Sequence, residues 1–160
     1  MMIMPLLLTN LLLTAANDTV WWNSDSGSVV EHRDRDAASC TLTLDDQHGQ
    51  IVFVWDRAMP TRVAVTQRAW KNTPGQITNV AVRIGEVWLD HGDGVRNITA
   101  MTATSSYMFI LNQPVDDLLL AARDIAVRTP DGGFQITLIP RKVQALVTAL
   151  HKCQAVIARL

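Results

Sequence analysis

Alternation of apolar and polar residues dominates the middle of the chain and predicts a series of β-strands. The clearest strand carries Cys40, Leu42 and Leu44 on one face, with threonines between them. Such period-two alternation is typical of a strand that buries one face. After the turn "DDQHG", residues 51–55 alternate again, so the two segments form the clearest hairpin in the sequence.

Comparable segments predict further strands at 20–22, 61–70, 77–90, 98–111, 125–129 and 134–140. Within 77–90 the parity of the apolar residues changes at Gly85, which predicts a bulge or a tight bend there.

Two segments follow helical spacing instead. A short helix is predicted near 115–123, led by Pro114. From Arg141 to the end, apolar residues recur at steps of three and four and predict a terminal helix. We expect this apolar stripe to pack on the sheet rather than to form a coiled-coil seam or a membrane-surface helix. Its members are Val143, Leu146, Leu150, Cys153, Ile157 and Leu160.

The predicted fold is therefore mainly β. It is an antiparallel β-sandwich or barrel-like domain, with the terminal helix packed on the sheet. An open α/β sheet is the alternative, but the strands follow one another without helices between them. Residues 17–160 show no linker or repeat and are expected to form a single domain.

Residues 1–16, "MMIMPLLLTNLLLTAA", are apolar and predict a signal peptide with cleavage near Asn17. No basic residue precedes the apolar run, so a buried N-terminal strand or helix is the alternative. With a signal peptide the protein is periplasmic or secreted, and the mature chain has no membrane span.

The chain has two cysteines, Cys40 and Cys153, and both fall on predicted core-facing positions. In an oxidising compartment they can pair and tie the terminal helix to the sheet. Two unrelated buried thiols are the alternative. Two isolated cysteines cannot fill a metal site, so no cofactor or metal is expected.

Charge and motifs narrow the function classes. The net charge is −1 and the basic residues are scattered, so no nucleic-acid partner is expected. The chain has no GxSxG, SxxK, GxGxxG or Walker motif. We therefore expect an exported binding or interaction domain without catalytic machinery, whose partner is another protein or a cell-envelope component. One alternative is a secreted hydrolase inhibitor that presents "NTPGQ" or "DHGDG". Another is a small hydrolase that uses aspartates with the turn histidines His48 or His91.

The five tryptophans are numerous for 160 residues, and tryptophan is a favoured anchor of binding surfaces. Trp88 lies opposite in parity to its apolar neighbours, and Trp70 ends a strand beside a turn. These two residues are the candidates for a recognition surface. Burial of both is the alternative.

The segment "LLLAARDIAVRTPDGGFQITLIPRKVQALVTALHKC" resembles the closing part of small exported bacterial proteins of the invasion-associated locus B type. The resemblance implies a periplasmic or secreted β-sandwich with a role in host interaction, and it supplies no catalytic residue. The chain differs in having two cysteines where such proteins usually have more. It also has Ile139-Pro140 where a Gly-Phe pair commonly opens the last helix.

Overall fold

The computed structural model describes residues 17–57, 61–89 and 97–160, which form eleven strands and two helices. The strands are β1 (Asn17–Ser24), β2 (Gly27–Arg33), β3 (Ala38–Asp45), β4 (Gln50–Asp56), β5 (Thr61–Thr66), β6 (Ile77–Ile84), β7 (Val87–Trp88), β8 (Ile98–Thr102), β9 (Ser106–Leu111), β10 (Asp124–Thr129) and β11 (Gly132–Thr137). The helices are α1 (Asp116–Ala121) and α2 (Pro140–Ile157).

All strand pairs are antiparallel and belong to one sheet with the order β1-β2-β3-β4-β5-β9-β8-β6-β10-β11. The short strand β7 pairs with β6 beside this path. Among the described strands β1 and β11 have one neighbour each, so the sheet is not closed. The predicted antiparallel, mainly β fold is confirmed.

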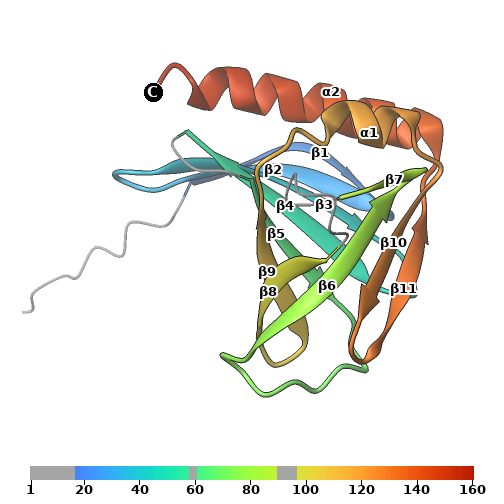
Figure 1. Cartoon of the computed structure of the whole chain (residues 1–160). Helices are drawn as coiled ribbons and strands as arrows, with labels where there is room; N and C mark the ends of the chain where they lie inside the picture. The colour runs from blue at the N-terminus through green and yellow to red at the C-terminus, as the bar shows by residue number, and fades with distance from the viewer. Residues whose placement is uncertain (1–16, 58–60, 90–96) are drawn as a thin grey trace, which may run out of the picture.

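The sheet is strongly curled, and α2 lies across one side of it with α1 alongside (Figure 1). Helix α2 contacts β1, β2 and β3. It begins with Pro140 at its first turn, where a missing N–H costs nothing. The predicted apolar stripe is buried on the sheet from Val143 to Ile157, whereas Leu160 lies beyond the helix end and is 57% exposed.

The predicted β3–β4 hairpin is confirmed. Leu42 lies opposite Phe53 and Leu44 opposite Ile51, and all four side chains are buried in the core. The parity change at Gly85 is a tight bend, since Gly85 has a φ of +57° in the turn that joins β6 to β7.

Two features differ from the expectation, and a third lies outside the described residues. Strand β2 was not predicted, because its sequence "GSVVEHR" carries charges where a buried face would be apolar. The short helix spans Asp116–Ala121, slightly less than the predicted 115–123. The predicted signal peptide, 1–16, lies outside the described residues.

Candidate functional site

A disulfide between Cys40 and Cys153 joins strand β3 to helix α2, as the sequence predicted. The two Cα atoms are 6.1 Å apart, and both side chains are completely buried. A thiol from another molecule cannot reach a buried disulfide, so this bond is structural. It fixes the position of α2 over the first strands of the sheet.

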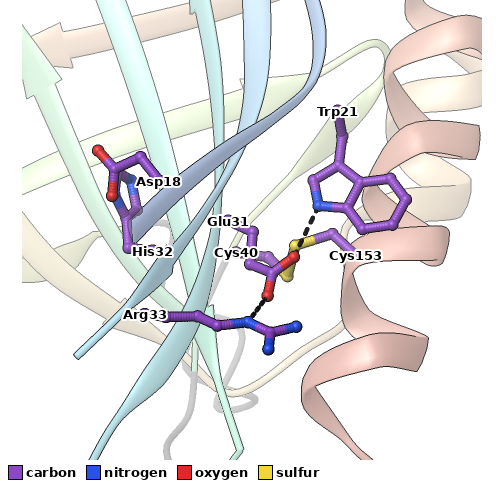
Figure 2. Close-up of polar contacts among 7 residues, drawn as sticks. All are labelled: Asp18, Trp21, Glu31, His32, Arg33, Cys40 and Cys153. Carbon is purple, nitrogen blue, oxygen red and sulfur yellow. Dashed lines mark hydrogen bonds and ion pairs between the residues drawn. A yellow bond between two sulfur atoms is a disulfide. The ribbon is translucent and has the colours of Figure 1, made fainter. Parts of the chain in front are cut away.

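A buried glutamate lies beside the disulfide (Figure 2). Glu31 of β2 is only 1% exposed and pairs across the sheet with Cys40. The indole Nε1 of Trp21 donates to Glu31 Oε2 at 3.0 Å, and Arg33 Nε donates to Glu31 Oε1. Both carboxylate oxygens are therefore paired, which offsets the cost of burying the charge. In Figure 2 the Trp21 ring lies between Glu31 and α2, so this carboxylate holds the indole in place.

A β-bulge in β1 brings two adjacent tryptophans to the same side of the strand. Val20 pairs with Val30 and Trp22 pairs with Val29, so Trp21 is an extra residue in β1. In a regular strand neighbouring side chains point to opposite faces, and a bulge cancels this alternation. As a result, Trp21 and Trp22 both pack against the core from the side that faces α2.

These tryptophans form one wall of an open groove of about 490 Å³ between β1 and α2, called here the β1–α2 groove. The opposite wall is the flank of α2. The lining side chains, besides two alanines, are Trp21, Trp22, Arg141, Gln144, Thr148 and Lys152. The groove thus combines aromatic surface with polar and cationic groups, a composition typical of binding sites.

The two cations of the groove have no ion-pair partner among the described residues, and no carboxylate lines it. Lys142, their neighbour on the helix, differs because its ammonium pairs with Asp25 at 2.8 Å. This pair lowers the pKa of the Asp25 carboxyl, through a hydrogen bond first and the charge of Lys142 second. Arg141 and Lys152 therefore give the groove a net positive charge.

The two predicted recognition tryptophans have different outcomes. For Trp70 the expectation of a surface position was wrong. Its ring is 4% exposed and packs edge-on against Tyr107 at 5.2 Å. Trp88 is half-buried with the Arg128 guanidinium 5.0 Å from its ring centre. It lines a separate depression of about 420 Å³ with Asn79 and Asn97, which remains a second candidate surface.

Of the two histidines proposed for the hydrolase alternative, the structure describes only His48. His48 lies in the β3–β4 turn, and its backbone N–H bonds to Asp46. His91 lies outside the described residues. Two other histidines form exposed pairs with aspartates, His32 with Asp18 and His151 with Asp116, each at 2.9 Å. Within 17–57, 61–89 and 97–160, no group of three or more His, Cys, Asp or Glu side chains could hold a metal.

The first loop proposed for the inhibitor alternative, "NTPGQ" at 72–76, is bonded to β8 and the turn after it. Gly75 N–H donates to Thr102 O at 2.8 Å, and the Thr102 hydroxyl donates to Thr73 O at 2.6 Å. Asn72 N–H donates to Thr104 O at 3.0 Å. The second loop, "DHGDG" at 90–94, lies outside the described residues.

A polar cluster next to Trp70 closes the core around Tyr107. The Tyr107 hydroxyl lies 2.5 Å from Asp131 Oδ2 and 3.1 Å from Asn72 Oδ1. Because a hydroxyl has one proton, the shorter contact takes it. Turning the Asn72 amide over then lets its otherwise unpaired Nδ2 donate to the tyrosine oxygen. The cluster is thus explained as a structural network.

Tyr107 gives a direct test of this network, because it is the one tyrosine of the chain. Burial raises its pKa to about 12, and the Asp131 carboxylate adds to the rise. We expect tyrosinate absorbance to titrate near this value in the folded protein and near about 10 in denaturant. Folding then favours the protonated form, so stability should fall between pH about 10 and about 12.

The variant Asp131→Asn should lower the Tyr107 midpoint but leave it above the denatured value, since burial is the largest cause. Asp117→Asn, an exposed change on α1, is the matched control and should leave it unchanged. A folded-state midpoint equal to the denatured one would contradict the network.

Comparison of the chain with protein-family models, curated proteins and solved structures found no match. The resemblance to the invasion-associated locus B type therefore has no support beyond the quoted segment.

Proposed function

We propose that the protein is an exported domain that binds another molecule in the β1–α2 groove. The observation that carries this proposal is the pairing of Trp21 and Trp22 with two unpaired cations across an open groove. Tryptophan and arginine are the residues most enriched at the energetic centres of interfaces. Glu31 and the disulfide hold both walls in place, which lowers the entropy cost of binding.

Export is supported by the disulfide, because such bonds persist in oxidising compartments. In the described part of the chain, neither helix has the length and apolar character needed to cross a membrane. Mass spectrometry of protein recovered from the periplasm or the medium should give an N-terminus near Asn17. Recovery of only the full-length chain, from the cytoplasm, would contradict export.

Binding in the groove can be tested by placing a photo-crosslinking amino acid at Gln144 in cells that produce the protein. Gln144 is exposed and lines the groove. We expect a crosslinked product of defined mass, and its loss when Trp22→Ala is added. Asn97 is the comparison site, because it lines the depression beside Trp88, and exposed Thr137 on β11 is the control.

Equal crosslinking at Gln144 and Thr137 would mean non-specific contact and would refute the proposed site. A product at Asn97 alone would move the binding surface to Trp88. The expected result is a product at Gln144 but not at Thr137. The three results differ in which positions give a crosslinked product, so the crosslinking pattern tests the assignment of the groove.

A further inference from the structure

The β1–α2 groove runs beside the free edge of the sheet. Strand β1 has β2 as its one partner among the described strands. No backbone hydrogen bond joins Asn17–Asn23 to any described residue outside β2. An edge strand presents unpaired N–H and C=O groups, which an extended peptide can satisfy by adding a further strand.

Helix α2 contacts β1, β2 and β3, and its flank faces Trp21 and Trp22 of the edge strand β1 as the second wall of the groove. The groove therefore lies where the inward-facing side chains of an added strand would be placed. Backbone pairing would supply affinity there, and contacts with Trp21 and Trp22 would supply selectivity for apolar side chains.

The positive charge of the groove restricts the class of partner further. Arg141 and Lys152 are eleven positions apart on one helix, about 16 Å along its axis. An extended chain rises about 3.3 Å per residue, so this distance corresponds to about five residues. Two acidic side chains on the same face of a strand, four positions apart, can therefore each approach one of the cations.

We propose that the β1–α2 groove binds an extended acidic peptide segment, which pairs with the free edge of β1 and places carboxylates near Arg141 and Lys152. This inference rests on the proposed binding function and names its partner class. A basic peptide is excluded by repulsion from two unpaired cations. A lipid surface would use the charge of the groove but not the unpaired backbone of β1.

The test uses the disulfide-bonded protein recovered after export and a capped, fluorescent nine-residue peptide of alternating valine and threonine, with glutamates at its third and seventh positions. Binding is followed by fluorescence anisotropy at low salt. We expect saturable binding that weakens at least tenfold when lysines replace the glutamates. Methylation of alternate backbone nitrogens should weaken it at least tenfold as well, because it removes the donors needed for strand addition.

Variants of the protein locate the site. Arg141→Gln and Lys152→Gln should each weaken binding about three- to tenfold and together abolish it, and higher salt should mimic them. Lys142→Gln is the matched control, because Lys142 is paired with Asp25 and does not line the groove. It should change binding less than twofold. Circular dichroism should show that all the variants remain folded.

The inference is overturned if the glutamate and lysine peptides bind equally, if neither binds, or if backbone methylation has no effect. Binding to phosphatidylglycerol vesicles that requires Arg141 and Lys152, with no peptide binding, would also overturn it and identify a lipid surface as the partner. If Gln144 gives a crosslinked product in cells but the acidic peptide does not bind, the proposed binding function stands and only the acidic-peptide inference is rejected. If there is neither a crosslinked product at Gln144 nor peptide binding, the binding function is rejected as well.

Discussion

Replacing Cys40 and Cys153 together by alanine is expected to lower the free energy of unfolding by about 5 kcal/mol. The disulfide joins residues 113 positions apart. In the chain-entropy account a loop of this length contributes about 4.8 kcal/mol by restricting the unfolded chain. Domains of this size are stable by about 5–15 kcal/mol in total, so the double variant should be only marginally folded at 25 °C.

The measurement is urea denaturation of the parent protein and the double variant, each with and without reductant. Reductant should destabilise the parent and leave the double variant unchanged. The double variant is thus the control for any effect of reductant other than breaking the disulfide. Before reduction, alkylation should label no thiol in exported protein. A parent protein whose midpoint is insensitive to reductant, or whose two thiols are alkylated in native material, would contradict the structural role of the bond.

Loss of the disulfide should also affect the groove, because the bond fixes α2 over β3. The cationic wall of the β1–α2 groove belongs to α2, and the aromatic wall belongs to β1. The Cys40→Ala/Cys153→Ala variant is therefore expected to bind more weakly in the groove than the parent, under conditions in which its sheet stays folded.

Much of the fold could be predicted because burial leaves a periodic trace in the sequence. Cys40 shares its parity with Leu42 and Leu44, and Cys153 lies on the helical stripe with Leu150. A buried face of a strand and a buried stripe of a helix must meet in one core, so the two cysteines could be expected to lie close together. The register and the disulfide confirm this.

The candidate site could not be predicted in the same way, because it depends on departures from periodicity. Without the bulge, Trp21 and Trp22 would point to opposite faces of β1. The buried Glu31 interrupts the apolar pattern of β2, and its role depends on partners from β1 and from the end of β2. Two adjacent tryptophans before a charged segment were the one available signal.

The burial of Trp70 could not be predicted for a different reason: here the local pattern was regular but misleading. A tryptophan that ends an alternating segment next to a turn looks like a surface anchor in the sequence. In the fold its ring closes one end of the core against Tyr107 and Phe134, which come from β9 and β11. These contacts are distant in sequence, so local alternation could not have indicated them.

Substitution of Leu150 by aspartate is expected to unfold the domain. Leu150 lies in the middle of the buried stripe of α2 and is completely buried. Truncating such a side chain costs about 2–5 kcal/mol, and an unpaired carboxylate in the core adds several more. The sum is comparable to the whole stability of a domain of this size.

Ala155→Asp is the matched control, because Ala155 is an exposed residue of the same helix. An aspartate there meets water and the negative end of the helix, so its cost should stay below about 1 kcal/mol. Circular dichroism and thermal denaturation of both variants provide the comparison. If Leu150→Asp melted at the temperature of the parent and lost only self-association or membrane binding, the stripe would be an interaction surface, and the packing of α2 on the sheet would not be what stabilises the domain.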